Sequence, residues 1–336
     1  MRIGVIGLGR MGMAHAANLA HHPGVDTVVL FGRDPGRVDA AASALTESPS
    51  RTGEVEVAAG GVETAITGLD GLVVATTTAT HSQFARLAAH SGVPSLVEKP
   101  LALDLDELTA LSAELDALDA PVMVGFHRRY DTGYRRLRQR VEEGDAGTLR
   151  LVRGTSHDHR PLPLGYIPVS GGVWRDLLIH DFDIVPWITG ERVVAVEAFA
   201  SVLDEPEYAR HGDADTAVAV LTLESGAFAV LSGTRRNGAG QDVRTEVYGT
   251  RGTFEAGLDS RTPVVSTEPG VEPPSATHDD FTDRFASAFR NEIDHFVRMA
   301  SGEAGNLTPP GEGLSSLRIA MAAEESVRSG RQVALR

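Results

Sequence analysis

A glycine-rich turn near the start of the chain restricts the possible folds more than any other sequence feature. The segment GLGRMG, residues 7–12, directly follows an apolar stretch at residues 2–6 that is typical of a β-strand, and it opens a predicted helix over residues 12–21. Gly7 permits a tight turn, Gly9 lets a pyrophosphate approach the backbone, and Gly12 lets the helix pack close to the strand. The free N–H groups of the first helical turn attract phosphate. This context predicts a dinucleotide-binding βαβ unit.

The first part of the chain alternates predicted strands with predicted helices. The strands are rich in Val, Ile and Leu and occupy residues 2–6, 27–31, 72–76, 95–98 and 121–126. Helical patterns occupy residues 12–21, 37–45, 82–91 and 105–118. Alternation of this kind, with continuously apolar strands, indicates a parallel sheet covered by helices on both faces. We therefore predict an α/β Rossmann domain that binds NAD(P) over residues 1–123.

The pattern changes after residue 123. A predicted helix (132–143) leads to a strand (149–155), a loop rich in Pro, Gly and His, and a second helix (174–187). Strands joined by short turns then follow, which is typical of an antiparallel sheet. They occupy residues 193–202, 216–223, 227–234, 243–248 and 253–256, before an exposed loop (263–279), two helices (280–299 and 313–329) and a tail strand (332–335). Residues 124–336 are predicted to form an α+β domain with a mostly antiparallel sheet.

Charge and composition exclude several classes of protein. With 31 Lys+Arg against 46 Asp+Glu, the formal net charge is −15, so nucleic-acid backbones and anionic membranes would be repelled. The absence of cysteine excludes disulfides, thiolate metal sites and a cysteine nucleophile. Apolar runs stay below the ~18 residues of a membrane span, and the first one reads as a strand rather than as part of a signal peptide. We expect a cytoplasmic protein with neither a nucleic-acid nor a membrane partner.

Lys99 is the only lysine among the 31 basic residues. Arginine serves wherever this chain needs a positive charge alone, but its pKa, above ~12, prevents it from releasing a proton. A single lysine on such a background is a candidate for catalysis, and an incidental surface position is the alternative. Glu98-Lys99-Pro100 follows a predicted strand, at the sheet edge where open α/β sheets bind ligands.

The residues after the second predicted strand bear on the choice of cofactor. NAD-binding domains usually carry Asp or Glu ~20 residues beyond the glycine motif, where it binds the ribose 2′-hydroxyl. Here Gly32 and Arg33 occupy that place, followed by Asp34. Glycine leaves room and arginine offers a forked donor for a 2′-phosphate, which favours NADP. The alternatives are a merely solvated Arg33 and an Asp34 that binds the NAD ribose from a shifted position.

Asp176 and His180 are spaced i and i+4 within the predicted helix 174–187, so they would share one helix face. Three interpretations compete for this pair. A metal site would need a third ligand, and Lys99 nearby would repel a cation. A buried structural histidine with a carboxylate partner is the second interpretation. The third is a histidine base beside a carboxylate, which the glycine motif and Lys99 favour.

Several motifs together resemble the Gfo/Idh/MocA oxidoreductases and cover nearly the whole chain. They are GLGRMG, the segment 73–78 leading to His81, EKP (98–100), GFHRRY (125–130), GGVWRDLLIHDFD (171–183), DADT (213–216) and EVYG (246–249). The sequence is most similar to the inositol 2-dehydrogenase branch. The resemblance implies that Lys99, Asp176 and His180 are the catalytic residues. It also implies an open-faced sheet in the second domain that packs against other subunits, as a homodimer or homotetramer.

The expected activity is an NAD(P)-dependent dehydrogenase that moves a hydride between a polyol, inositol or sugar-like substrate and nicotinamide. In this hypothesis His180 takes the hydroxyl proton, Asp176 orients the imidazole or binds an adjacent hydroxyl, and Lys99 hydrogen-bonds the reacting oxygen. The candidate cofactor contacts are Gly7, Gly9, Arg10, Met11, Gly12, Arg33, Asp34, Thr76, Thr77, His81, Glu98 and Lys99. Beside the catalytic residues, the candidate substrate contacts are Arg128, Asp158, Arg160 and Gln241, and no metal is expected.

The chain departs from the family pattern in three places. Gly32 replaces the acidic residue of typical NAD-using inositol dehydrogenases, Thr77 stands where many relatives have proline, and Gln241 stands where inositol enzymes commonly have tyrosine. Two other functions remain open. Some relatives keep the dinucleotide bound and cleave glycosides through transient oxidation. Others bind dinucleotide only as regulators, although these are expected to lack the lysine or the histidine.

Overall fold

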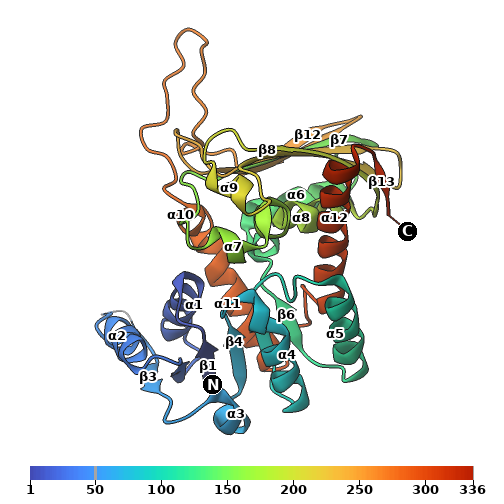
Figure 1. The fold of residues 1–336 in the computed structure, drawn as a ribbon. Coiled ribbons are helices and arrows are strands. Elements are labelled where there is room, and N and C mark those ends of the chain that lie inside the picture. The colour runs from blue at the N-terminus through green and yellow to red at the C-terminus, as the bar shows by residue number, and fades with distance from the viewer. Residues whose placement is uncertain (49–50, 336) are drawn as a thin grey trace. The chain divides into compact units, whose positions relative to one another are not determined.

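The computed structural model describes residues 1–48 and 51–335 and divides into two compact units (Figure 1). The first unit contains Met1–His127 and Ser287–Leu314, and the second contains Arg128–Ala286 and Ser315–Arg336. The chain thus returns to its first unit near the end, whereas the sequence suggested a single boundary at residue 123. The returning segment contributes a long helix, α11 (Ala286–Ala300), to the first unit.

The first unit is built on a six-stranded parallel sheet with the order β3-β2-β1-β4-β5-β6. This is the strand order of a dinucleotide-binding Rossmann fold, which confirms the predicted α/β class. β3, with the sequence EVEV at the edge of the sheet, was not predicted, because it lacks the continuous apolar run from which the other strands of this sheet were predicted. The strands are β1 (Arg2–Ile6), β2 (Thr27–Phe31), β3 (Glu54–Val57), β4 (Gly71–Val74), β5 (Ser95–Val97) and β6 (Val122–Val124).

Helices connect these strands close to the predicted positions: α1 (Arg10–Ala20), α2 (Pro35–Thr46), α4 (His81–His90) and α5 (Leu105–Ala117). α11 packs on the same sheet. Gly71 at the start of β4 leaves space for the ring of Phe296, which would lie 3.0 Å from an added Cβ. A helix from the far end of the chain therefore forms part of the core behind the central strands. The short helices of this unit are α3 (Val62–Ala65), η1 (Ile66–Gly68), η2 (Thr78–Thr80) and η3 (His127–Tyr130).

The second unit carries a seven-stranded sheet with the order β12-β11-β7-β10-β9-β8-β13. Every neighbouring pair is antiparallel except β7 and β10, which are parallel. The prediction of a mostly antiparallel sheet is therefore confirmed. The strands are β7 (Leu149–His157), β8 (Val193–Ser201), β9 (Thr216–Leu223), β10 (Phe228–Thr234), β11 (Asp242–Gly249), β12 (Thr253–Ala256) and β13 (Val333–Ala334).

Three helices cover one face of this sheet: α6 (Thr132–Glu142), α8 (Ile179–Thr189) and α12 (Pro310–Ser329) (Figure 1). On this side the backbone N–H of Ala198 in β8 donates to Oγ of Ser326 in α12 at 2.9 Å. Gly154 in β7 leaves room for Asp181 of α8. The other described helices are short: α7 (Ile167–Ser170), α9 (Glu207–Arg210) and α10 (Phe281–Arg284).

Among residues 1–48 and 51–335, no helix combines the length and the hydropathy needed to cross a membrane.

Candidate active site

The glycine turn after β1 has the shape that a bound pyrophosphate needs. Gly7 has φ of +92°, and an added Cβ would lie 2.5 Å from the backbone of Ala75. A Cβ on Gly12 would lie 1.7 Å from the carbonyl oxygen of Gly7, so only glycine lets α1 begin this close to the strand. A Cβ on Gly9 would meet nothing within 4 Å. The turn therefore combines close packing at its ends with open space in its middle, which fits a dinucleotide.

The residues after β2 separate the roles of Arg33 and Asp34. Asp34 caps α2, since its Oδ1 accepts hydrogen bonds from the backbone N–H groups of Gly36 and Arg37 at 3.0 and 3.3 Å. This commits one carboxylate oxygen of Asp34 to the helix start. Arg33 is exposed immediately after the strand. Of the two charged residues, Arg33 is the one without a structural role in the helix.

His81 links the loops that follow β4 and β5. It is buried, with Nδ1 2.8 Å from the carbonyl oxygen of Pro100 and Nε2 3.1 Å from that of Thr76. Burial lowers the pKa of His81 below its ordinary value, although both carbonyls favour the protonated ring. The neutral ring donates to one of these carbonyls. The ring holds the loop containing Thr76 and Thr77 in place. His81 would therefore affect cofactor binding indirectly, through the position of this loop.

Glu98 anchors the backbone beside Lys99. Its Oε1 lies 2.7 Å from Nε2 of His15 in α1, and its Oε2 accepts the backbone N–H of Lys99 at 3.3 Å. Burial opposes the ionised carboxylate, but the hydrogen bond and the charge of His15 outweigh it and keep the pKa of Glu98 below its ordinary value. The structure thus gives Glu98 an internal partner, and Lys99 follows it directly with a partly exposed side chain.

Glu292 of α11 is a buried carboxyl group that the sequence analysis missed. Its side chain is fully buried, and neither carboxylate oxygen has a hydrogen-bond partner among the described residues. Burial and then the negative charge of Glu98 raise the pKa of Glu292 well above its ordinary value. Of the two carboxyl groups, Glu98 thus favours the ionised form and Glu292 the protonated form. No sequence motif marks Glu292, because it lies 194 positions after Glu98 in the sequence and only the fold places α11 in the first unit.

Replacing Glu292 by glutamine is expected to stabilise the protein increasingly as pH rises. The folded chain keeps a proton on Glu292 at pH values where the unfolded chain has lost it. The free energy of unfolding is therefore undiminished below the ordinary carboxyl pKa and falls as pH rises from there towards the pKa of Glu292 in the folded chain. Glutamine resembles the protonated form and removes this loss, which is up to about 1.4 kcal/mol per pH unit above about pH 4.3.

Urea unfolding of both proteins between pH 5 and pH 8 measures this difference. Glu303→Gln, at an exposed glutamate in the following loop, is the matched control and should leave the pH dependence unchanged. A stability gain for Glu292→Gln that is the same at every pH would show that Glu292 is ionised in the folded state.

Residues 174–187 do not form one continuous α-helix, so the prediction of a single α-helix containing both Asp176 and His180 was wrong. Val173–Leu177 forms a π-helical turn, in which the N–H of Leu178 donates to the carbonyl of Val173 at 2.9 Å, and α8 begins at Ile179. Asp176 thus belongs to the π turn and His180 to the first turn of α8. Such turns are frequent at functional sites, because they change the direction of the side chains that follow.

The second unit brings together three of the predicted residues around an arginine that the sequence analysis missed. Nη1 of Arg235 donates to Oδ2 of Asp176 at 2.9 Å and lies 3.7 Å from Oδ2 of Asp158. Nε2 of Gln241 donates to Oδ1 of Asp158 at 2.9 Å, and Oε1 of Gln241 accepts from the backbone N–H of His159. Gln241 is buried, and its hydrogen bond holds the carboxylate of Asp158 in position from the protein interior.

A sequence signal for Arg235 existed. Ala229, Leu231 and Gly233 point to the covered face of β10, and the period of two continues this face to Arg235 rather than to Arg236. This register distinguishes Arg235, which is buried, from its exposed neighbour Arg236.

The other two predicted substrate contacts belong to separate networks. Arg128 is buried and donates to Oδ1 of Asp181 at 3.1 Å and to Oγ of Ser156 at 3.0 Å. This network ties the start of the second unit to β7 and α8. Arg160 is exposed and pairs with Asp279 at 2.6 Å, in the loop before α10. Neither guanidinium contacts Asp176 or Asp158 in any contact that the structure records for it.

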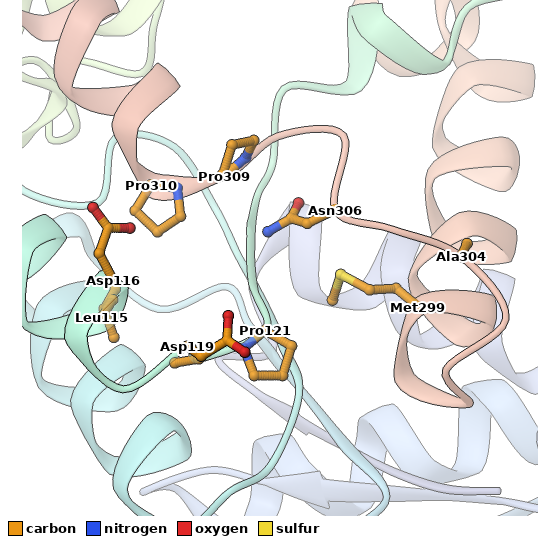
Figure 2. A pocket seen from close by; sticks show the side chains of 10 residues that line it. Leu115, Asp116, Asp119, Pro121, Met299, Ala304, Asn306, Pro309 and Pro310 are labelled. Atoms are coloured by element: carbon orange, nitrogen blue, oxygen red, sulfur yellow. The ribbon is translucent and has the colours of Figure 1, made fainter.

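A hollow of about 420 Å³ opens in the first unit between the end of α5 and the loop before α12 (Figure 2). Asp119, Ala120 and Pro121 on its wall precede β6, so it lies at the amino end of that strand. The glycine turn and Lys99 follow the carboxyl ends of β1 and β5, at the opposite edge of the sheet. We therefore do not assign this hollow to the reaction. The rest of its wall includes Leu115, Asp116, Met299, Asn306 and Pro310.

Two family models match most of the chain. A family model described as an oxidoreductase family with an NAD-binding Rossmann fold matches residues 1–126. A second, described as the GFO/IDH/MocA C-terminal domain, matches residues 134–255.

Individual relatives extend the similarity to the full chain. The chain is 36% identical to the myo-inositol 2-dehydrogenase of Thermotoga maritima, over 100% of this chain and 98% of the relative. The structure of a myo-inositol dehydrogenase from Corynebacterium glutamicum superposes with a TM-score of 0.88 at 28% identity, covering 100% and 99% of the two chains. A scyllo-inositol dehydrogenase from Lactobacillus casei, with bound NAD(H) and scyllo-inositol, superposes with a TM-score of 0.85 at 26% identity, covering 99% and 98%.

Proposed function

Since this chain belongs to the GFO/IDH/MocA family of oxidoreductases, we propose that it oxidises a ring hydroxyl of an inositol to a ketone. The chain is an NAD(P)-dependent oxidoreductase that acts on a CH–OH group of a polyol-type substrate. The observation that carries the finer proposal is similarity to inositol dehydrogenases along the entire chain, combined with Lys99, Asp176 and His180 in the matching motifs. Inositol bound in the Lactobacillus casei relative supports the substrate class.

The glycine turn after β1, the loop holding Thr76 and Thr77, and Arg33 would hold the dinucleotide, which accepts a hydride when bound. His180 takes the proton of the reacting hydroxyl as the hydride leaves the same carbon, so the alcohol becomes a ketone and the imidazole becomes protonated. Lys99 donates a hydrogen bond to the reacting oxygen and stabilises negative charge there. Asp176, held by Arg235, accepts a hydrogen bond from the imidazole or from a neighbouring hydroxyl.

The test of this proposal is reduction of NAD and NADP by the purified protein with inositols, aldoses and sugar acids. An inositol is expected to give the highest kcat/KM, with one ketone formed for each reduced dinucleotide. Cleavage of a glycoside without net reduction, by protein that retains its dinucleotide through purification, would instead favour the glycoside-cleaving alternative.

We further propose that Arg33 binds a 2′-phosphate and that the enzyme prefers NADP. Gly32 provides no acidic side chain for a ribose hydroxyl, and Asp34 caps α2. Arg33→Ala is expected to raise KM for NADP by about 10-fold to 100-fold, the value of a hydrogen bond to a charged group, with little effect on KM for NAD.

Initial rates with both cofactors measure this ratio. Arg86→Ala removes an arginine of α4 that pairs with Glu114, and it should change neither KM. An Arg33→Ala protein with an unaltered ratio of the two KM values would contradict the assignment.

We propose that the uncovered face of the second sheet joins two copies of the chain. Phe199, Val218 and Phe228 from three adjacent strands are 61%, 36% and 49% exposed, and Phe199 lies directly opposite Val218. A monomer would leave this apolar surface in water, which is unfavourable. Phe199→Asp is expected to halve the mass of the particle in solution, measured by light scattering. Leu203→Asp, at an exposed loop position, is the control, and an unchanged mass for Phe199→Asp would contradict the interface.

We also place the protein in the cytoplasm, where its cofactor is supplied.

A further inference from the structure

Arg235 is, with Arg128 and Arg129, one of three arginines among the described residues whose side chains are almost completely buried. It directly follows β10, is 1% exposed, and its backbone N–H donates to the carbonyl of Asp215 at 2.8 Å. Its neighbour Arg236 points outwards and pairs with Asp204, with about half of its side chain exposed. Two adjacent residues of one type thus have opposite environments. This makes Arg236 a matched control for Arg235.

Three carboxylates surround the Arg235 guanidinium. Asp176 and Asp158 lie 2.9 and 3.7 Å from Nη1, and Asp213 is the third. Burial opposes the charged guanidinium, but these carboxylates outweigh it and raise the pKa of Arg235 above its ordinary value. The hydroxyl of Tyr208 accepts the backbone N–H of Leu162 at 3.2 Å and interacts electrostatically with Arg235, Asp213 and Asp158, and burial raises the pKa of that tyrosine. Arg235 is therefore a permanent cation among several acidic groups.

The carboxylates differ in their access to solvent. Asp213 is committed to the backbone, because its Oδ1 accepts from the N–H groups of Val173 and Ala214 at 2.7 and 2.8 Å. The side chains of Asp176 and Asp158 are 15% and 17% exposed, against 2% for Arg235. Arg235 therefore contacts the carboxylates of Asp176 and Asp158 from the protein interior, while both carboxylates remain partly accessible to solvent. Each can accept a hydrogen bond from a ligand while its charge is balanced by the same guanidinium.

We propose that Arg235 is a positioning residue for the dehydrogenase reaction, fixing Asp176 as an ionised acceptor and coupling it to Asp158 through one shared guanidinium. This inference rests on the proposed function, since Asp176 is assigned there to the imidazole or a neighbouring hydroxyl. Gln241 completes the arrangement by holding the second oxygen of Asp158. Without Arg235, the two carboxylates would repel each other and one would turn away or take up a proton.

The central experiment compares Arg235→Met with wild type and with Arg236→Met. Methionine keeps much of the buried volume and removes the charge. We expect kcat to fall about 10²-fold, the loss typical of misplaced catalytic groups, and the acid limb of the pH profile of kcat/KM to move to higher pH, because loss of a cation favours protonation of the acids and bases beside it. Arg236→Met should match wild type in both. Dinucleotide binding and the melting temperature show whether each variant is folded.

Two further variants keep the test decisive if Arg235→Met fails to fold. Arg235→Lys retains the charge but loses the fork, so the acid limb should return to the wild-type position while kcat recovers only in part. Asp158→Asn should raise KM for the polyol with a smaller change in kcat, since the pair between Arg235 and Asp176 remains. Any displacement of the acid limb should be to lower pH, opposite to that of Arg235→Met, because loss of a negative charge disfavours protonation of the groups beside it.

Different outcomes identify different errors. A wild-type protein that oxidises no polyol would overturn the proposed function and this inference with it. An active wild type, with folded Arg235→Met or Arg235→Lys proteins that lose activity without the predicted pattern in the acid limb, would assign Arg235 a purely structural role. Folded Arg235 variants with wild-type kcat and pH profile would overturn the inference alone.

Discussion

Replacing Lys99 by methionine is expected to lower kcat by about 10³-fold while leaving dinucleotide binding nearly unchanged. The glycine turn after β1 and Arg33 hold the dinucleotide in this account, so binding does not depend on the Lys99 ammonium. The chemical step does, because the ammonium stabilises charge on the reacting oxygen. Lys99→Arg should also be strongly impaired, since the guanidinium keeps the charge but loses the compact donor and the adjustable pKa. Steady-state kinetics and dinucleotide titration separate the two effects.

Chemical modification gives an independent test, because Lys99 is the only lysine of the chain. An amine-selective reagent has two targets, Lys99 and the N-terminal amine, which pairs with Asp26 at 2.6 Å. Activity should fall in proportion to modification of Lys99, and dinucleotide with substrate should protect it. Peptide mass analysis assigns each modification. Full modification of Lys99 with full activity would remove it from the catalytic residues.

The second large effect is expected at His180. His180→Gln should reduce kcat in the oxidation direction by about 10² to 10⁴-fold, the contribution of a positioned proton acceptor. Wild-type kcat/KM should fall at low pH, because a protonated imidazole cannot accept the hydroxyl proton, and the residual activity of the variant should lose this limb.

His211→Gln is the matched control, since His211 is a partly exposed histidine that contacts Glu207 at 3.3 Å in the second unit. It should retain both the wild-type rate and the acid limb. A His180→Gln protein that keeps most of its activity, or keeps the acid limb, would show that another group accepts the proton.

Local sequence patterns predicted the regular elements well where the chain alone determines them. The strands at residues 2–6, 27–31, 216–223 and 253–256 begin and end where apolar runs meet turn residues, and the structure places β1, β2, β9 and β12 at those residues. The glycine turn also has the predicted geometry, because the steric demands at Gly7 and Gly12 are local. The family resemblance is confirmed by the full-length similarity.

Features that depend on tertiary contacts were not predictable in this way. The predicted helix at 280–299 is divided between α10 and α11, and α11 belongs to the other unit. The π turn before α8 follows two glycines with positive φ, Gly171 and Gly172, whose conformation no periodicity reports. Glu292 looks like an ordinary polar residue of an amphipathic helix until the fold places it near Glu98.

The candidate site shows the same division. Motifs predicted Lys99, Asp176 and His180 as catalytic residues, and this stays a prediction. They could not distinguish Asp158, held in the Arg235 cluster, from Arg160, which pairs with Asp279 at the surface. Arg235, which organises the cluster, directly follows β10 and is far from the motif in sequence. Side chains that hold the site residues in position are themselves placed by tertiary packing, so no local sequence motif identifies them.

The most direct test of the central claim is the fate of the hydrogen on the reacting carbon. Purified protein is incubated with inositol deuterated at its ring carbons and oxidised dinucleotide, and both products are analysed by mass spectrometry. The account predicts one deuterium in each reduced dinucleotide and one ketone for each deuterium transferred. Ketone formation accompanied by reduced dinucleotide that carries no deuterium would contradict direct hydride transfer by this enzyme.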